Sequence, residues 1–291
     1  MHDCETAMSQ SDWHETLRND PRTIEELVQC ALTDTDDERA SDAIYVLQFR
    51  ASRQILDKAL ELCLSPDSKR RELGADILGQ FGCFETRPYP FFDETVERLV
   101  AMLPGEQEPG VLNAVGIGLG HRFDPRGVLP LSKLKSHPDD DVRYAVVIGL
   151  AGQTDLLAIQ TLIDLTRDDA TKVRDWATFT LGQMCDIDTP AIRESLWQRT
   201  DDSDDDTRCE AFSGLAQRHD ESIVPKLIGE LRREVISTQA IEAARDLGSP
   251  QLLEVLHELK GFTFDEPTHV LIDEAIVSCT KSTTDMTPTL V

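Results

Sequence analysis

The chain has 291 residues, of which 40% are hydrophobic and 5% aromatic, and it carries a formal net charge of −25. This length supplies a large core, but it is too long for one compact core of ordinary size unless the fold is elongated. A surface this acidic repels phosphate backbones, so the charge argues against nucleic-acid binding and favours a basic protein partner.

The cysteines and the first residues indicate a cellular location. The seven cysteines are scattered and include no CxxC pair, which is typical of free thiols in a reducing cytosol. Residues 1–20 are polar and acidic and have no basic, apolar leader pattern. No segment has the apolar length of a membrane span. We therefore expect a cytoplasmic protein that has no contact with a membrane.

Along the chain, amphipathic runs recur in pairs after a polar N-terminal tail over residues 1–20. The second run of each pair ends near a leucine, which Gly or Ala follows in most repeats. Successive leucines of this kind are 31, 41, 31, 31, 34 and 32 residues apart. These register leucines are Leu47, Leu78, Leu119, Leu150, Leu181, Leu215 and Leu247. A small residue lies four positions before most of them and allows a neighbouring helix to approach closely.

Two helices in each repeat of about 31 residues cannot bury their apolar faces alone and must stack on their neighbours. The pattern therefore predicts an all-α fold, an α-solenoid of about seven helix pairs over residues 21–280. Residues 269–279 form a C-terminal cap, and residues 281–291 form a tail. The longest interval reflects an insertion around residues 83–92, rich in turns and aromatics. The insertion is either a functional edge loop or a satellite core, and the sequence leaves both open.

The repeated helix has a specific pattern, as in Val142-Arg143 before Leu150-Ala151 and Val173-Arg174-Asp175-Trp176-Ala177 before Leu181-Gly182. It resembles the phycobilisome-lyase subclass of HEAT repeats over nearly the whole chain. The stretches Val46–Gln48, Arg70–Gln80 and Val173–Ala177 resemble more closely the bacterial YibA-like HEAT proteins. Those proteins are typically encoded beside Rhs polymorphic-toxin genes, so this resemblance implies an immunity role.

Acidic runs precede the second helices of several repeats. Any single aspartate in such a run is explained by helix capping, but the run from residue 201 to residue 206 supplies five carboxylates. Because these turns recur on one edge of a solenoid, we expect them to merge into an acidic rim. The rim residues are Asp139, Asp140, Asp141, Asp201, Asp202, Asp204, Asp205 and Asp206. Their spacing lacks the Gly and terminal Glu of a calcium-binding EF-hand loop, so no metal site is predicted.

One arginine occupies the same position in four second helices. The four are Arg71, Arg143, Arg174 and Arg208. Lying one repeat apart and close to the acidic turns, they predict a structural Asp–Arg ladder that holds the repeats in register.

Aromatic residues gather on the second helices of the middle repeats, the helices that line the concave surface of HEAT stacks. Aromatic side chains and nearby charges on such a surface are typical of binding hot spots. The predicted partner-binding residues are Tyr144, Asp175, Trp176, Phe179, Glu210 and Phe212. Packing within its own repeat is the simpler interpretation for Trp176 alone, whereas the cluster as a whole favours binding.

Catalytic interpretations have little support. His14-Glu15 and His257-Glu258 resemble the His-Glu pairs of the di-iron hydroxylases built on HEAT repeats, but those enzymes need four pairs at equivalent helices. No HExxH motif, GxSxG motif or phosphate loop is present. We therefore expect a protein that is not an enzyme, needs no cofactor and binds a basic protein, for which a toxin domain is one candidate. A general scaffold remains open, as does an enzyme of the HEAT-repeat lyase or metal-dependent hydroxylase type.

Overall fold

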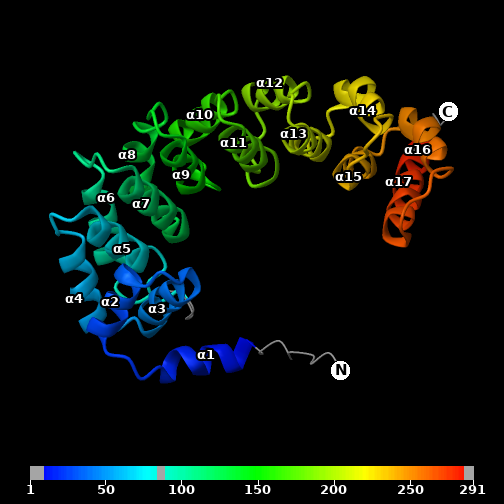
Figure 1. Cartoon of the computed structure of the whole chain (residues 1–291). Helices are drawn as coiled ribbons and strands as arrows, with labels where there is room; N and C mark the ends of the chain where they lie inside the picture. Colours follow the sequence, from blue (N-terminus) through cyan, green and yellow to red (C-terminus); the bar gives the residue numbers. More distant parts are fainter. Residues whose placement is uncertain (1–9, 84–88, 285–291) are drawn as a thin grey trace, which may run out of the picture. The chain divides into compact units, whose positions relative to one another are not determined.

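The structure, a computed structural model, describes residues 10–83 and 89–284, and within these ranges it consists of α-helices, short 3₁₀ turns and connecting loops (Figure 1). Seventeen α-helices are described, and no strand occurs among the described residues. Most helices form pairs with the helix that follows them in the chain. Each pair buries its apolar faces against the neighbouring pairs. The predicted all-α repeat fold is confirmed.

The first of two compact units comprises residues 1–150. A short helix, α1 (Gln10–Asn19), precedes four helix pairs. The pairs are α2 (Ile24–Thr33) with α3 (Asp37–Arg50), α4 (Arg53–Leu62) with α5 (Ser68–Gly79), α6 (Phe92–Met102) with α7 (Pro109–Arg122), and α8 (Val128–Ser132) with α9 (Asp140–Leu150). A 3₁₀ turn, Pro125–Gly127, leads into α8.

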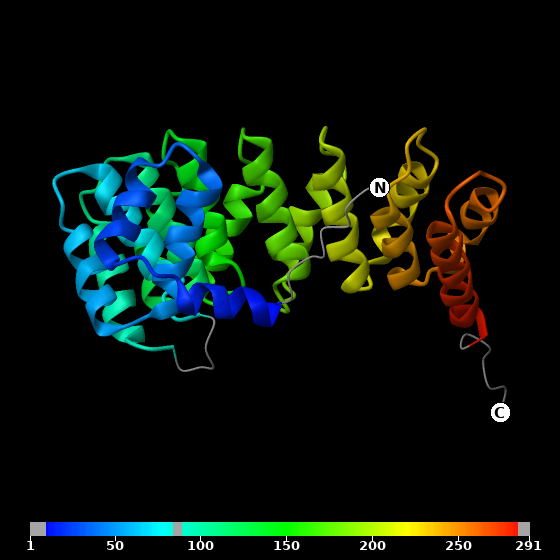
Figure 2. The same cartoon turned by 60° about the horizontal axis from the view of Figure 1, so that its bottom comes forward.

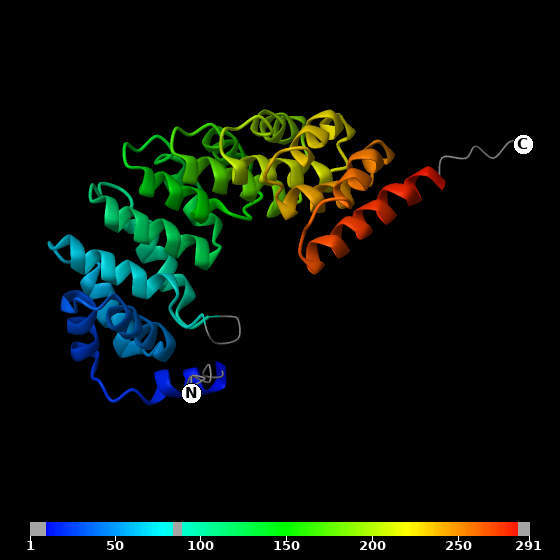
Figure 3. The same cartoon turned by 45° about the vertical axis from the view of Figure 1, so that its right-hand side comes forward.

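The second compact unit comprises residues 151–291. It also contains four pairs, and 3₁₀ turns at Glu221–Ile223 and Pro250–Leu252 introduce two of their first helices. The pairs are α10 (Leu156–Leu165) with α11 (Thr171–Gln183), α12 (Pro190–Arg199) with α13 (Asp205–Gln217), α14 (Val224–Leu231) with α15 (Thr238–Leu247), and α16 (Leu253–Leu259) with α17 (Glu266–Thr284). The run over residues 269–279 that was predicted as the cap lies within α17, the last helix (Figure 3).

Within each unit the second helices of successive pairs pack directly on one another and form one layer. In the first unit this second-helix layer runs α3, α5, α7, α9, and in the second unit it runs α11, α13, α15, α17 (Figure 2). Within each unit, the first helices form a separate layer on one side of the second helices (Figure 1). This arrangement leaves one face of each second-helix layer available to other molecules.

The register leucines form the centre of the core. All seven are buried, with at most 6% of their surface exposed. Glycines let the second helices approach to backbone contact at one equivalent place in each unit: a Cβ built on Gly79 of α5 would lie 2.7 Å from the Cα of Gly118 of α7. The same crossing occurs between Gly182 of α11 and Gly214 of α13. The leucine and small-residue pattern therefore sets the distance between repeats.

The two predicted tails are shorter than expected. The prediction of a polar tail over residues 1–20 is wrong for residues 10–19, which form α1. This helix packs on α3, where Leu17 is 4% exposed and the Trp13 ring meets Tyr45 edge-on at 5.9 Å between ring centroids. At the other end α17 continues to Thr284, beyond the expected boundary at residue 280. Residues 1–9 and 285–291 lie outside the described residues.

The insertion around residues 83–92 is described on both sides of residues 84–88, which lie outside the described residues. Phe81 is fully buried, and the Phe91 ring lies 6.3 Å from it between centroids. The Tyr89 ring stacks under the guanidinium of Arg122 at 5.6 Å. The described part of the insertion thus packs under the repeats as a satellite core, which was one of the two predicted alternatives.

Candidate protein-binding surface

The arginines at the shared second-helix position make the same set of contacts. In each case Nη1 donates to carbonyl oxygens in the turn that precedes its own helix, for example from Arg174 to Asp168 O and Asp169 O at 3.0 and 3.1 Å. In Arg71, Arg174 and Arg208, Nε and Nη2 also hold a carboxylate of the following repeat as a fork. The carboxylates are Glu106 for Arg71, Asp202 for Arg174 and Glu230 for Arg208, at 2.8–3.1 Å.

Bidentate arginine–carboxylate contacts combine charge with a fixed geometry, so they orient one repeat on the next. Arg71 holds the pKa of Glu106 below its ordinary range. Arg143 donates from Nη1 to His137 O at 2.8 Å and to Pro138 O at 3.2 Å, the same turn contacts as in the other repeats. The contacts place these arginines in the repeat framework, and two of the three carboxylate partners are glutamates.

A second arginine series went unrecognised in the sequence. Arg122 and Arg218 each lie three residues after a register leucine and are buried. Arg122 donates to Leu78 O and Phe81 O at the end of α5, and Arg218 donates to Leu181 O, Gly182 O and Cys185 O at the end of α11, at 2.6–3.0 Å. Each guanidinium thus caps the carbonyl end of the preceding second helix, where the helix dipole favours a cation.

The acidic run from residue 201 to residue 206 is largely neutralised within the chain. Asp201 pairs with Lys226 at 2.6 Å, and Asp202, 9% exposed, accepts from Arg174 and Arg199 at 3.0 Å. Asp204 caps α13 by accepting from Thr207 N at 2.9 Å. Asp205 pairs with Arg208. Among the described residues, three carboxylates of this run therefore pair with a cation, Asp204 caps a helix, and Asp206 has neither role.

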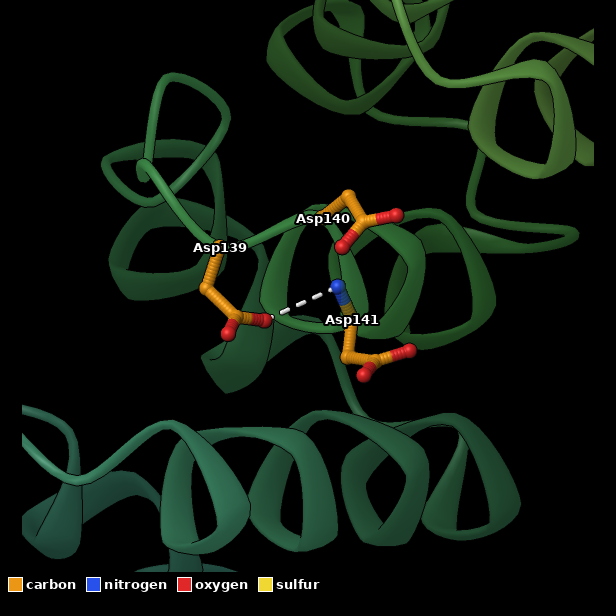
Figure 4. A group of neighbouring side chains, drawn as sticks. All are labelled: Asp139, Asp140 and Asp141. Carbon is orange, nitrogen blue, oxygen red and sulfur yellow. Dashed lines mark hydrogen bonds between the residues drawn. The ribbon is translucent and has the colours of Figure 1, made fainter.

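Asp139, Asp140 and Asp141 begin α9 in the first unit (Figure 4). An oxygen of Asp139 accepts from Asp141 N at 2.9 Å and from Val142 N at 3.2 Å, so this aspartate caps the helix. One ligand atom from each residue lies within 4.8 Å of the other two, but the side chains of Asp140 and Asp141 project outward from the first turn (Figure 4). The cluster has the composition of a helix N-terminus, and helix capping and the macrodipole account for it.

The predicted aromatic cluster is only partly at the surface. Phe212 is 1% exposed and belongs to the core, so its prediction as a partner-contacting residue is wrong. Trp176 keeps 39% of its surface exposed, and its ring meets the half-buried Phe179 edge-on at 5.6 Å between centroids. Tyr144 lies on α9 of the first unit and is half-buried. In the second unit, the surface part of the predicted cluster thus consists of Trp176 and Phe179.

Beside these rings the second-helix layer carries carboxylates without a cationic partner. Asp175 is half-buried, and its Oδ1 is buried without a donor. Glu210, 9% exposed, accepts from the neutral amides of Gln183 and Gln239, which connect α11, α13 and α15. Together with Asp206 they leave three carboxylates on this layer that no Lys or Arg of the described residues neutralises. We name Asp175, Trp176, Phe179, Asp206 and Glu210 the acidic aromatic patch.

The environment of the patch resists the ionisation of Asp175 and Glu210. Burial, and after it the nearby negative charge of Glu210, raises the pKa of Asp175 to about 6. Burial also raises the pKa of Glu210, despite the hydrogen bonds from the two glutamines. A cation placed on the patch would relieve this repulsion. The patch is therefore electrostatically suited to a lysine or arginine side chain.

The two His-Glu pairs considered for catalysis lie in different units and make local contacts. The His14 ring packs on Phe49 at 5.3 Å, and Glu258 pairs with Arg232 at 2.8 Å. His14 belongs to the first unit and His257-Glu258 to the second. Among the residues that the structure describes, the one group of three potential metal ligands is Asp139, Asp140 and Asp141.

Comparison with known proteins identifies the repeat. The family model for HEAT repeats matches residues 96–182 and 129–205, which include α11, one of the two helices that carry the patch. The chain has the HEAT-repeat fold. None of the helices described in it combines the length and apolar character that crossing a bilayer requires.

The chain is similar to protein YibA of Escherichia coli strain K12 and of Escherichia coli O157:H7. The sequences are 27% identical over 228 residues, which cover 76% of this chain and 79% of YibA. The X-ray structure of Escherichia coli YibA matches with a TM-score of 0.76 at 24% identity, over 96% of this chain and all of that one. An engineered protein matches with a TM-score of 0.56 at 18% identity, over 88% of this chain and 78% of its own. The predicted YibA-like resemblance is confirmed.

Proposed function

We propose that this protein is a non-catalytic, protein-binding scaffold that holds a basic protein on its second-helix layer. The acidic aromatic patch of the second unit supplies the contact. The observation that carries the proposal is the set of carboxylates at Asp175, Asp206 and Glu210. No Lys or Arg that the structure describes pairs with them, although most neighbouring acids pair with arginine or lysine. The net charge of −25 extends the same preference over the whole surface.

Aromatic and charged side chains make complementary contributions at such a surface. Trp176 offers a large apolar ring, and Asp175 beside it offers a half-buried acceptor. Interfaces depend most on tryptophan, tyrosine and arginine at their centre, where truncation costs about 2 kcal/mol or more. The acidic surface around them accelerates the approach of a basic partner.

The test is affinity capture at low salt, identification of the captured protein, and binding measurements with the purified pair. Trp176→Ala is expected to weaken binding by about 30-fold, which corresponds to about 2 kcal/mol. Trp197→Ala is the matched control, because Trp197 is 38% exposed on α12 in the first-helix layer. Added salt should slow association more than it speeds dissociation. Equal affinities of the wild type and Trp176→Ala would refute the proposed surface.

A finer form of the proposal is that the basic partner is a toxin domain that the chain neutralises, the role implied by the YibA-like resemblance. The free thiols and acidic composition suit a cytoplasmic site of action, which stays a prediction. Co-expression tests this form: the captured partner should arrest growth alone and lose that effect beside the wild-type chain. A captured partner that does not arrest growth would exclude the toxin and favour a general scaffold. Stoichiometric iron in the purified protein would instead favour an enzyme of the hydroxylase type.

A further inference from the structure

The first unit contains a small pocket on its own second-helix layer. Its walls come from three helices that pack side by side, α3, α5 and α7, and its volume is about 150 Å³. The floor is the backbone contact between Gly79 and Gly118, where no side chain fills the space. At about 30 Å³ for each water molecule, the pocket accommodates about five waters. This is enough room for the end of one long side chain.

Two acceptors of the pocket have no donor. Gln48 is 2% exposed, and its Nε2 donates to Asp76 O at 2.8 Å. That bond fixes the orientation of the amide, because a carbonyl oxygen accepts only from the NH₂ side. The Oε1 atom of Gln48 is therefore an acceptor, and it is buried without a partner. A buried acceptor left unsatisfied costs about 1–3 kcal/mol.

Asp76 adds a negative charge to the same pocket. Its carboxylate makes no hydrogen bond or ion pair with any residue that the structure describes, although it is only partly exposed. Burial, and then the nearby Glu72, raises the pKa of Asp76 to about 7. On the opposite wall, burial and Arg122 lower the pKa of His121, so that ring is neutral at pH 7 and offers no competing charge.

We propose that this pocket binds the cationic end of one lysine or arginine side chain of the basic partner. Asp76 supplies the counter-charge, and Gln48 Oε1 accepts one of the N–H bonds of the cation. Tyr45, 38% exposed at the wall, presents an aromatic ring beside the entering side chain. The source of the cation rests on the proposed function, whereas the chemistry of the pocket does not.

Other occupants fit the pocket less well. One carboxylate and one amide oxygen are too few ligands for Ca²⁺, which takes six to eight oxygens. An anion would meet Asp76, and an apolar group would leave both acceptors unsatisfied. A group that carries several N–H donors and a positive charge satisfies both acceptors at once, and lysine and arginine are the protein side chains of this kind.

The test is an NMR titration of the full chain with Nα-acetyl-lysine methylamide and Nα-acetyl-arginine methylamide, with the norleucine analogue as the neutral probe. At least one cationic probe should shift the backbone amide signals of Gly79 and Gly118 saturably, with a Kd of about 1 mM. Norleucine should bind about tenfold more weakly or not at all. Equal shifts by norleucine, or no shift by either cationic probe, would overturn the proposal.

Two variants and one control define the site. Asp76→Asn is expected to weaken the binding of the cationic probes by about tenfold, because it removes the negative charge from the pocket. The matched control is Asp42→Asn, on an exposed position of α3 that does not line the pocket, and its affinity should equal that of the wild type. If Asp76→Asn does not fold, Gln80→Lys places a resident ammonium group on the pocket wall and should abolish probe binding. Undiminished binding in Gln80→Lys would refute the proposal.

The same variants separate this inference from the proposed function. A captured basic partner that binds Asp76→Asn and the wild type equally would exclude the pocket and retain the acidic aromatic patch. Failure to find any basic partner, with intact probe binding at Gly79 and Gly118, would retain the pocket and refute the proposed function.

Discussion

The closest test of the repeat packing is a glycine substitution at the crossing of α11 and α13. A Cβ at Gly214 would lie 2.5 Å from the Cα of Gly182 and 3.1 Å from a methyl group of Leu196. A Cβ at Gly182 would meet the Cα of Gly214 only at 3.2 Å. Because backbone atoms cannot turn aside as a flexible side chain does, Gly214→Ala must push the two helices apart, whereas Gly182→Ala needs a shift of a few tenths of an ångström.

The expected magnitudes follow from two opposing terms. Alanine stabilises a helix by about 1 kcal/mol relative to glycine, and overpacking a core costs about 1–3 kcal/mol. For Gly214→Ala the steric term reaches the upper end, so we expect a net loss of about 2 kcal/mol. For Gly182→Ala the terms roughly cancel. Gly229 on α14 is exposed, with no atom within 4 Å of an added Cβ, so Gly229→Ala should gain about 1 kcal/mol.

Urea unfolding of the three variants, followed by circular dichroism, measures this order. We expect the midpoint of Gly229→Ala to be highest, that of Gly182→Ala to be near the wild type, and that of Gly214→Ala to be lowest. A Gly214→Ala protein as stable as Gly229→Ala would show that α11 and α13 are not in backbone contact. It would then refute the argument that glycines set the repeat distance in this unit.

Three further predictions concern the charged framework. Arg218→Met removes the donors to Leu181 O, Gly182 O and Cys185 O and should cost about 3 kcal/mol in urea unfolding, whereas Arg167→Met, at an exposed position, should be nearly neutral. Glu106→Gln should cost about 2 kcal/mol at pH 7. Because Arg71 lowers the pKa of Glu106, this stabilisation is present above the unfolded pKa and is lost as pH falls through the folded one, so the variant and the wild type should converge at pH 3. The pH dependence of stability at Asp76 has the opposite sign. Its pKa is raised to about 7, so the protonated carboxyl stabilises the folded state at low pH, and this stabilisation is lost as pH rises from 4 through 7. Asp76→Asn should therefore raise the thermal midpoint by about 3 °C at pH 8 and hardly change it at about pH 4. The groups that face Asp76 in this measurement are Glu72 and Lys69 of α5, Tyr45 of α3 and His121 of α7.

The repeat could be predicted because its cause is local. A leucine every 31 to 34 residues, with a small residue one turn before it, requires stacking whatever the rest of the chain does. The short helix α1 was missed because its apolar contacts come from only two side chains, Trp13 and Leu17, which lie one helical turn apart in a polar segment. Only their packing on α3 reveals that they form a helix.

The candidate surface was predicted less accurately, for an identifiable reason. Phe212 lies three residues before the register leucine Leu215, and Thr178 occupies the same position before Leu181. Both are buried, at 1% and 0% exposure, because this position faces the core in every second helix of the unit. Phe179 lies two residues before its leucine and is half-buried. The position of each aromatic residue relative to the register leucine, rather than its residue type, distinguishes core aromatics from surface aromatics.

The acidic run shows a second limit. Lys226, Arg174 and Arg199 neutralise Asp201 and Asp202, and two of these cations come from other repeats, 25 to 28 residues away. How closely these cations approach the aspartates depends on the angle between repeats, which cannot be predicted from the composition of the acidic run. The five carboxylates therefore indicated an acidic rim, whereas four of them serve the framework.

The contrast between paired and unpaired acids is the strongest argument for binding surfaces on this chain. Where a carboxylate serves the fold, as Glu106 and Asp202 do, an arginine holds it as a fork. Asp76 in the first unit and Asp175 in the second are held by no cation of the described part of the chain, and burial raises the pKa of both. An asparagine at either position would avoid this cost without changing the shape of the side chain. Because packing gives no reason for a charge at these positions, they support the proposal that a cation from outside the chain binds there.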